Sequence, residues 1–358
     1  MAKRKTKKKL LGSLFKKSSL TSIILLLLTT LFKMGETVYH DQLPAELPSS
    51  ENPIRLYANQ QNDDLAKLYL DAIKSAQNSI TLVIYSLVDQ RIIAALQQKA
   101  LDGIYVYIVC DAQASVGISR KLPAPIIVKR LAKGLTHQKI LIIDDSRILL
   151  GSANMTHDSL QKHGNLVIGL DNPALAKMMN EKAHSMDEEG NYTPLKPQIT
   201  KAGAQTVELW ELPDNAKDGV ERVIQLLRSA KKTIRVAMYT WTRRDFTQEL
   251  INAKLRGVKV EAVIDRYSGK GASASIVKML KESQIPTRLN TTQGLLHYKF
   301  AYIDEEILIN GSANWTNAAF KDNDDVFLVI YPLTNDQKIK MNELWQVIWK
   351  ASADAKSK

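Results

Sequence analysis

The sequence is poor in the residues that build disulfide frameworks and metal clusters. It contains one cysteine and six histidines among 358 residues. The single cysteine, Cys110, excludes an internal disulfide and cysteine-based metal clusters, and it leaves the redox compartment open. Its place in an apolar run predicts a small buried side chain. Zinc-binding spacings such as H-E-x-x-H are absent too, and four histidines match no motif: His40, His157, His163 and His184.

Acidic residues are missing from the start of the chain. Residues 1–17 hold eight lysines and arginines, so the remainder carries only about +4 of the net charge of +12. The apolar run over 20–32 is short for a membrane-spanning helix. No clear A-x-A cleavage site follows, so residues 1–35 predict an uncleaved signal anchor in preference to a removed signal peptide. The preceding basic residues predict a cytoplasmic N-terminus and a membrane-associated or exported body outside the cytoplasm.

The rest of the chain predicts two α/β lobes preceded by polar linkers. Residues 36–53 and 189–205 are rich in proline, glycine or polar side chains, which is typical of linkers. Residues 54–188 and 206–350 alternate β-branched strands with amphipathic helices, which predicts parallel strands joined by right-handed crossovers. Each lobe is long enough to bury a core. A polar tail, 351–358, ends the chain.

The second lobe repeats the first. His137 to Asn154 and His297 to Asn314 both read H-x-K-x4-D-x6-G-S-x-N, at an offset of 160 positions (297 − 137). Upstream of these motifs, Asp111 matches Asp265 at an offset of only 154 positions (265 − 111). Lobe two therefore holds six extra residues between Asp265 and its motif (160 − 154), which predicts an insertion in a loop at the rim of a site.

Each copy of the motif predicts a strand, a turn and a second strand. The apolar residues after each lysine predict a buried strand, on which side chains alternate between faces. The histidine and lysine therefore share a face, and Asp144 and Asp304 fall on the other, where we expect them to fix the turn into the next strand. Each Gly-Ser-x-Asn ends that second strand, where Gly151 or Gly311 allows a close backbone approach.

The paired motif predicts a site that handles a phosphodiester. Two lysines and two asparagines can hold the charged oxygens while one imidazole attacks phosphorus and the other protonates the leaving oxygen. Each lobe supplies half of this set, so we expect the site where the lobes meet. The lysines already supply positive charge, so neither a metal nor another cofactor is expected. The predicted site residues are His137, His297, Lys139, Lys299, Asn154 and Asn314, with Ser152 and Ser312 as further substrate contacts.

The two motifs closely resemble the signature of the phospholipase D superfamily, over roughly residues 54–350. The resemblance implies an α/β protein with two duplicated α/β/α sandwich lobes and an active site at their interface. It also implies a phosphodiesterase that works through a phosphohistidine intermediate. We expect a monomer because both motifs lie in one chain.

The resemblance further implies a residue that orients a catalytic histidine. In the superfamily an acidic residue eleven positions after the motif's asparagine commonly has this role, often for the histidine of the other lobe. Asp325 stands there in lobe two, but Asn165 stands there in lobe one. If Asp325 reaches across, His137 is the nucleophile and His297 the general acid, because a carboxylate on one imidazole nitrogen makes the other more nucleophilic. His297 would then lack a carboxylate partner.

The sequence leaves three functions open. The first is hydrolysis or transfer of the phosphatidyl group of phospholipids, with the anchor holding the site beside a membrane surface. The second is an endonuclease acting on nucleic acid, and the third is a non-catalytic, membrane-anchored binding protein, which ranks last because both motifs are complete. Five residues just after predicted strands suit base stacking and phosphate pairing, or equally a basic rim for any anion: Trp241, Arg243, Arg244, Arg266 and Lys270.

Overall fold

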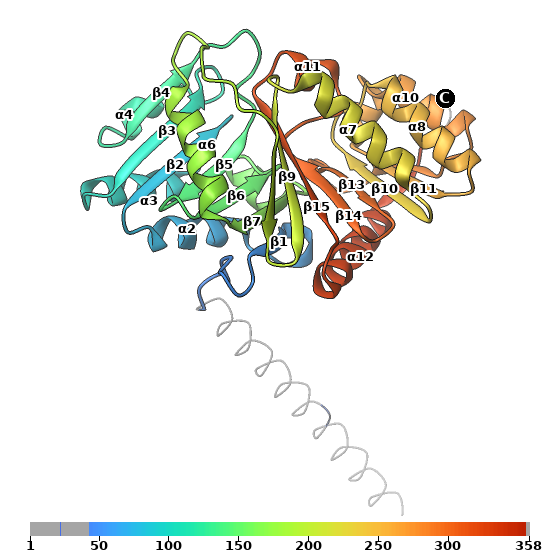
Figure 1. Cartoon of the computed structure of the whole chain (residues 1–358), viewed down its shortest axis with the longest axis horizontal. Coiled ribbons are helices and arrows are strands. Elements are labelled where there is room, and N and C mark those ends of the chain that lie inside the picture. The colour runs from blue at the N-terminus through green and yellow to red at the C-terminus, as the bar shows by residue number, and fades with distance from the viewer. Residues whose placement is uncertain (1–21, 23–42, 356–358) are drawn as a thin grey trace, which may run out of the picture. The chain divides into compact units, whose positions relative to one another are not determined.

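The computed structural model of the protein describes Ser22 and residues 43–355. Apart from Ser22, the predicted signal anchor at 1–35 lies outside the described residues, as does the first part of the linker, 36–42. Within the described part, no helix is both long enough and apolar enough to cross a bilayer. The chain from Glu46 onward forms one compact unit, which holds both lobes (Figure 1).

Lobe one is built on a mixed seven-stranded sheet with the order β1-β7-β6-β5-β2-β3-β4. Only β2, β3 and β4 pair with one another in parallel. The predicted parallel pairing is therefore wrong for the other strands, because β5, β6, β7 and β1 each pair antiparallel with their neighbours. The strands are β1 (Ile54–Ala58), β2 (Ser79–Ile84), β3 (Tyr105–Asp111), β4 (Ile126–Arg130), β5 (Lys139–Ile143), β6 (Arg147–Gly151) and β7 (Leu166–Asp171).

Four helices of lobe one, α2, α3, α5 and α6, begin at side chains that cap them. Asp89 accepts hydrogen bonds from the first backbone amides of α3, and Thr156 caps α5 in the same way. Pro173 occupies the first turn of α6, where a missing N–H costs nothing. The helices are η1 (Asn59–Gln61), α2 (Leu65–Ser75), α3 (Gln90–Leu101), α4 (Ile118–Lys121), α5 (His157–Gln161) and α6 (Pro173–Ser185).

Lobe two repeats this sheet and extends it at both edges. Its order is β16-β12-β11-β10-β13-β14-β15-β9-β8, so the inner seven strands follow the order of lobe one. The predicted class, two duplicated α/β lobes, is confirmed by this match. The strands are β8 (Gln198–Ala202), β9 (Gln205–Leu212), β10 (Thr233–Met238), β11 (Lys259–Ile264), β12 (Thr287–Asn290), β13 (Lys299–Ile303), β14 (Ile307–Gly311), β15 (Asp325–Tyr331) and β16 (Ser352–Asp354).

The two added strands correct the predicted segment boundaries. β8 and the first residue of β9 lie inside the linker predicted over 189–205, and β16 lies inside the tail predicted over 351–358. Both β8 and β16 are edge strands whose exposed side chains mix apolar and charged residues, Ile199 and Lys201 in β8 and Ala353 and Asp354 in β16. Such strands lack the apolar pattern that marks a buried strand, which is why their composition resembles that of a linker.

The six extra residues of lobe two are part of packed helices and not of a rim loop. The segment between β11 and β12 forms α9 and α10, where lobe one has only the short α4 between β3 and β4. Ile276 and Leu280 of α10 are fully buried in the outer core of the lobe. The helices of lobe two are α7 (Ala216–Ser229), α8 (Arg244–Leu255), α9 (Arg266–Lys270), α10 (Ala274–Glu282), α11 (Asn317–Lys321) and α12 (Asn335–Lys350).

One apolar core is shared by both lobes. A single cluster of buried side chains includes Ile140 and Leu166 from the sheet of lobe one and Phe300 and Leu328 from that of lobe two. Residues of α6 and α12, among them Trp345, belong to the same cluster. A second cluster fills lobe two beneath α7, α8 and α10, which lie together in Figure 1. The lobes are therefore fused through their inner faces.

Equivalent backbone bridges join the lobes on both sides of the interface. Thr136 bridges to Asp324, and Leu296, its counterpart in lobe two, bridges to Gly164. Each bridge immediately precedes a motif histidine. Two glycines allow the chains to approach so closely, because a Cβ atom on Gly134 would lie 2.1 Å from the Asp322 oxygen, and one on Gly294 would lie 2.1 Å from the Lys162 oxygen.

Candidate active site

The two histidines and two lysines of the motifs lie where the central strands of the two sheets end. Lys139 is the first residue of β5 and pairs with Ile84, the last residue of β2, and Lys299 pairs in the same way with the last residue of β10. His137 and His297 are each 7% exposed, and the lysines are 1% and 2% exposed. All four side chains are thus buried, and the histidines are slightly more exposed than the lysines.

His137 is held by a carboxylate from the other lobe. Its Nδ1 lies 2.8 Å from Asp325 Oδ1, and Asp325 is fully buried at the start of β15. Burial alone would raise the pKa of Asp325, but the charge and hydrogen bond of His137 outweigh burial and lower that pKa. The carboxylate therefore stays ionised beside the imidazole. Asp325 thus reaches across the interface.

His297 is held by an amide in the equivalent position. Its Nδ1 lies 3.0 Å from Asn165 Oδ1, which belongs to lobe one. Burial holds the pKa of His297 well below its ordinary value, and Lys299, Lys139 and His137 add to this effect through their charges. Each imidazole is thus held by a residue of the other lobe, so both histidines lie at the interface between the lobes.

Each lysine contacts the backbone carbonyl of the histidine in its own motif and the ring of a tyrosine. Lys299 Nζ donates a 2.7 Å hydrogen bond to the carbonyl of His297, and Lys139 Nζ donates to that of His137. Lys139 also lies 5.2 Å from the ring centre of Tyr85, and Lys299 lies 4.9 Å from that of Tyr239. Burial lowers the pKa of Lys139 to about 7 although Asp325 and Asp111 oppose the change. A bound anion would restore the charge on such lysines.

The asparagines and serines of the motifs have different environments. Thr240 N donates to Asn314 Oδ1 at 3.2 Å, which leaves the amide hydrogens of Asn314 for a substrate. Asn154 Oδ1 is buried without a hydrogen-bond partner among residues 43–355. Ser152 and Ser312 are fully buried and donate to Asn165 and Asp325, respectively. Both serines therefore hold the imidazole partners, and the predicted substrate contact is corrected.

The motif aspartates and glycines organise the strands around the site. Asp144 accepts hydrogen bonds from the backbone amides of Gln77, Asn78 and Ser79, and Asp304 accepts three from the equivalent residues of lobe two. They tie the turn after each motif strand to the start of the neighbouring strand, which extends the role predicted within the turn itself. A Cβ atom on Gly151 or Gly311 would lie 2.2 Å from a strand oxygen, so the close approach expected of both is present.

Two more pairs of residues shape the site, and sequence reasoning missed their roles. Asp111 Oδ2 accepts from the backbone N–H of Thr136, and Asp265 Oδ2 accepts from that of Leu296, so each fixes the residue before a motif histidine. Tyr85 packs against His137 with the two ring centres 5.4 Å apart, and Tyr239 packs against His297 with the ring centres 4.9 Å apart. All four residues recur at the 154-position offset, and that repetition was the signal that could have identified them.

The residues predicted to line a nucleic-acid mouth do not form one. Trp241 is fully buried, with its ring 4.6 Å from that of Trp315, so it offers no face to a base. Arg243 is 8% exposed, pairs with Asp245 and lies over the rings of Phe246 and Phe320. Arg244, Arg266 and Lys270 keep some exposure, but none of them contacts a motif residue in the described structure.

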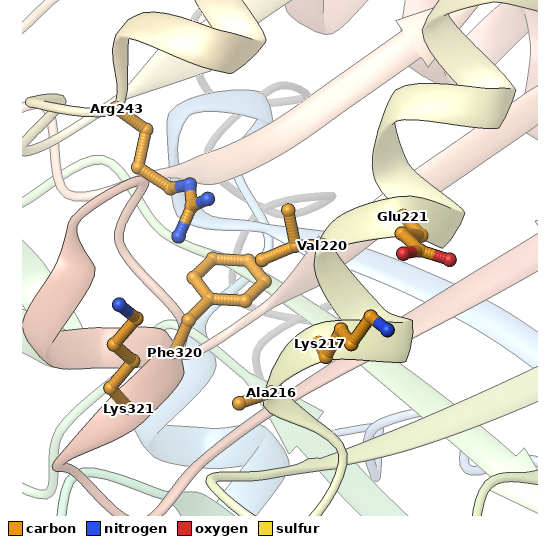
Figure 2. A pocket seen from close by; sticks show the side chains of 7 residues that line it. All are labelled: Ala216, Lys217, Val220, Glu221, Arg243, Phe320 and Lys321. Atoms are coloured by element: carbon orange, nitrogen blue, oxygen red, sulfur yellow. The ribbon is translucent and has the colours of Figure 1, made fainter.

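Arg243 instead borders a separate pocket of about 330 Å³ on lobe two. Figure 2 shows its guanidinium group directed towards the Phe320 ring. The pocket is wide and contains none of the motif side chains, so the chemistry does not reside there. Its lining comes from α7, α11 and the turn before α8: Ala216, Lys217, Val220, Glu221, Arg243, Phe320 and Lys321.

Fold and site together define a two-lobed phosphodiesterase to which each lobe contributes one histidine and one lysine. A family model described as "Cardiolipin synthase, PLD-like domain" matches residues 69–186 and 223–345. The chain belongs to the phospholipase D superfamily, and the resemblance drawn from the motifs is confirmed.

Individual relatives match shorter parts of the chain. A phospholipase D of Rickettsia typhi is 33% identical over 108 residues, which are 30% of this chain and 52% of that protein. The mitochondrial cardiolipin hydrolase of Homo sapiens is 25% identical over 166 residues, which are 44% of this chain and 66% of that protein. The chain thus spans about half to two thirds of the length of these relatives.

A solved structure resembles the chain over nearly its whole length. The phosphatidylserine synthase of Haemophilus influenzae Rd KW20 has a TM-score of 0.67, and the alignment covers 88% of this chain and 90% of that one. The sequence identity is 13%. At this identity the similarity shows the two-lobed fold and nothing about the substrate.

Proposed function

We propose that the protein is a phospholipase D-type enzyme that hydrolyses phospholipids, or transfers their phosphatidyl group to an alcohol, through a phosphohistidine at His137. The observation that carries the proposal is the unequal pairing of the two imidazoles. His137 lies 2.8 Å from a carboxylate, whereas His297 lies 3.0 Å from an uncharged amide. One imidazole is thus tuned to attack and the other to release a proton.

In the first step, Nε2 of His137 attacks phosphorus and forms a P–N bond while the bond from phosphorus to the leaving oxygen breaks. His297 donates its Nε2 proton to that oxygen, so an alcohol departs. Asp325 stabilises the positive charge that His137 acquires, because its carboxylate is ionised and fully buried. His297 is left neutral, which its depressed pKa favours.

In the second step, a water molecule or an alcohol attacks the same phosphorus. His297 takes a proton from the attacking oxygen, the P–N bond breaks, and His137 is released as a neutral imidazole after the transfer. Lys139 and Lys299 stabilise the charge on the equatorial oxygens in both steps. Their burial at 1% and 2% exposure makes this stabilisation strong, since little water competes.

The exposed surface near the site favours a lipid substrate. Val116, Leu131 and Leu135 are 75%, 63% and 40% exposed. They lie in loops that leave β3 and β4 at the edge of the sheet where β5 begins, and Leu135 stands two residues before His137. Apolar side chains beside the buried motif lysines suit a molecule whose phosphate reaches the lysines while its acyl chains stay outside.

The relatives support the same substrate class. They include a phospholipase D and mitochondrial cardiolipin hydrolases, so lipid phosphodiesters occur among the substrates their names state. The endonuclease alternative has less support here, because the buried Trp241 and the paired Arg243 cannot bind bases or phosphates as predicted. A membrane surface is thus the proposed partner, with the predicted N-terminal anchor holding the body beside it.

The test compares two phosphodiesters with the same purified full chain. Vesicles of phosphatidylcholine with or without cardiolipin are assayed for released head group, and single-stranded and duplex DNA are assayed for cleavage. We expect turnover of lipid and intact DNA. Cleavage of DNA with untouched vesicles would overturn the lipid substrate and leave the phosphodiesterase chemistry in place.

A further inference from the structure

The two lobes differ at three equivalent positions around the partners of the imidazoles. Positions separated by the 160-residue offset of the motifs (325 − 165) can be compared directly, because both lobes have the same strand order there. The differences lie on the short helix after the Gly-Ser-x-Asn turn and in the loop that follows it. Lobe one has Ser159, His163 and Asn165, where lobe two has Ala319, Asn323 and Asp325.

In lobe two, the neighbouring side chains offer hydrogen-bond donors to the Asp325 carboxylate. Asp325 Oδ1 accepts a 2.6 Å hydrogen bond from Ser312 Oγ in addition to its contact with His137. The side-chain amide of Asn323 approaches Asp325 Oδ2 at 3.4 Å. Every group around this carboxylate is a hydrogen-bond donor, which is what an anion requires.

In lobe one, the groups around the equivalent residue, Asn165, match the oxygen and the nitrogen of an amide. Asn165 Oδ1 accepts from Ser152 Oγ at 2.9 Å and faces His297 Nδ1 at 3.0 Å. Asn165 Nδ2 donates to the Ser159 carbonyl at 2.7 Å and lies 3.2 Å from the Ser159 hydroxyl oxygen. The His163 carbonyl, at 3.3 Å, is a third acceptor on the same side.

The backbone carbonyls around Asn165 favour an amide over a carboxylate. An aspartate at this position would place a carboxylate oxygen against the Ser159 carbonyl, where two acceptors would repel each other. The Ser159 hydroxyl also accepts a 2.9 Å hydrogen bond from the Asn154 backbone N–H. Ser159 therefore links a motif asparagine to the amide that contacts His297. The three differences between the lobes are mutually consistent.

We infer that Ser159 and Asn165 are positioning residues that make His297 a dedicated general acid. The Ser159 carbonyl orients the Asn165 amide so that its oxygen faces His297. That oxygen keeps a hydrogen on Nδ1 and leaves Nε2 as the nitrogen that exchanges the proton with the leaving oxygen. An uncharged amide stabilises the imidazolium less than a carboxylate does, so His297 gives up its proton more readily. The role of acid rests on the proposed function, whereas the positioning does not.

The other charged and titratable groups around His297 act in the same direction. Lys299, Lys139, His137 and His163 all lower its pKa, after burial as the main cause. The ring of His163 lies 6.3 Å from that of His297. Only a residue at position 165 contacts Nδ1 directly, so exchange at this position is the informative change.

The test measures His297 itself by NMR of the full chain labelled with ¹⁵N-histidine, with the His297→Gln variant identifying its signals. In the unchanged protein we expect the neutral ring to carry its hydrogen on Nδ1. Asn165→Ala should allow both tautomers. Asn165→Asp should lower the acid dissociation constant of His297 by about 10- to 1000-fold, and the alkaline limb of kcat/KM should move to higher pH by the same factor.

A combined variant keeps the test informative if Asn165→Asp alone fails to fold. The set Ser159→Ala, His163→Asn and Asn165→Asp introduces the side chains found around Asp325 and adds the amide donor of Asn323, so it should melt higher than Asn165→Asp and show the same change in the dissociation constant. An unchanged dissociation constant in this set, or a persistent Nδ1–H tautomer in Asn165→Ala, would overturn the inference. The titration needs no turnover, so a protein inactive on vesicles would refute the proposed substrate and leave the positioning role intact.

Discussion

Asp325 Oδ1 in lobe two lies 2.8 Å from His137 Nδ1 in lobe one, although the two residues are 188 positions apart in the chain. The contact depends on the bridge between Thr136 and Asp324, which aligns the residue before each partner. Neither lobe alone contains a histidine with its partner. The reactive form of His137 is therefore a property of the interface.

Replacing Asp325 by Asn tests this contact. The amide keeps the shape but removes the charge that stabilises the His137 imidazolium, so we expect kcat to fall by about 10²- to 10⁴-fold. Release of head group from vesicles measures the loss. Asp322→Asn is the matched control, because that side chain is 46% exposed and its ion pair with Lys133 is long, at 3.9 Å. A kcat within twofold of the unchanged protein would contradict the role of Asp325.

Removing either motif histidine should abolish turnover. We expect His137→Ala and His297→Ala each to lower kcat by at least about 10³-fold, because both imidazoles act in every cycle. His157→Ala is the control, since His157 is exposed on α5. Mass spectrometry of acid-quenched protein should find the phosphatidyl adduct on His137. An adduct on His297 and none on His137 would reverse the roles.

Alanine at Gly134 or Gly294 should disturb the interface beside the site. A new Cβ atom would lie 2.1 Å from a backbone oxygen of the opposite lobe in both cases. We expect a loss of about 1–3 kcal/mol in the free energy of unfolding, together with reduced kcat, because the loops that carry Asp325 and Asn165 must shift. Gly103→Ala is the control: it has open space but a positive φ, so it should lose stability and keep kcat. Equal kcat in all three variants would refute the argument.

The buried Lys139 should make stability depend on pH. Burial lowers its pKa from 10.5 to about 7, so between these values the unfolded chain binds the proton and the folded chain does not. The free energy of unfolding should therefore fall as the pH is lowered from about 10 to about 7, by up to about 1.4 kcal/mol per pH unit from this residue. Urea denaturation of the unchanged protein and of Lys139→Met measures the difference.

The control for this titration is Lys129→Met, because Lys129 is exposed on β4. The unchanged protein and Lys129→Met should share one pH dependence, and Lys139→Met should show a shallower one. If all three proteins lose stability in parallel, Lys139 is charged in the folded state at neutral pH.

The exposed leucine beside the site should matter for vesicles only. Leu131→Ser removes an apolar side chain that is 63% exposed, and we expect the KM for phospholipid vesicles to rise about tenfold. Hydrolysis of a short-chain phospholipid below its micelle concentration should be unchanged. Leu255→Ser, at a leucine that is 80% exposed on α8, should affect neither assay. An equal loss on monomers and vesicles would mean that Leu131 shapes the site itself.

The fold could be predicted from the sequence wherever an apolar pattern repeats. The motif strands β5 and β13 begin at Lys139 and Lys299, one residue before the apolar runs that the pattern identified as buried, and end with those runs. The antiparallel pairing and the edge strands could not be predicted in this way. Pairing direction depends on how the connections turn the chain, and β8 exposes Ile199 and Lys201 on alternate positions, so its outward face mixes apolar and charged side chains and carries no strand pattern.

Local pattern also limited the prediction of the site. Composition marks Trp241 and Arg243 as binding residues, yet packing against Trp315 and pairing with Asp245 engage both side chains. The serines of the motifs were placed on phosphate, because nothing in a strand's periodicity shows that Ser152 and Ser312 bond across to the next strand. These roles depend on contacts between distant residues, and a single sequence does not encode them locally.

The common apolar interior makes separation of the two lobes costly. Ile140, Leu166, Phe300 and Leu328 belong to one buried cluster that draws on both sheets, so pulling the lobes apart would expose apolar surface to water. The same packing preserves the pairing of His137 with Asp325, because the two partners belong to different lobes.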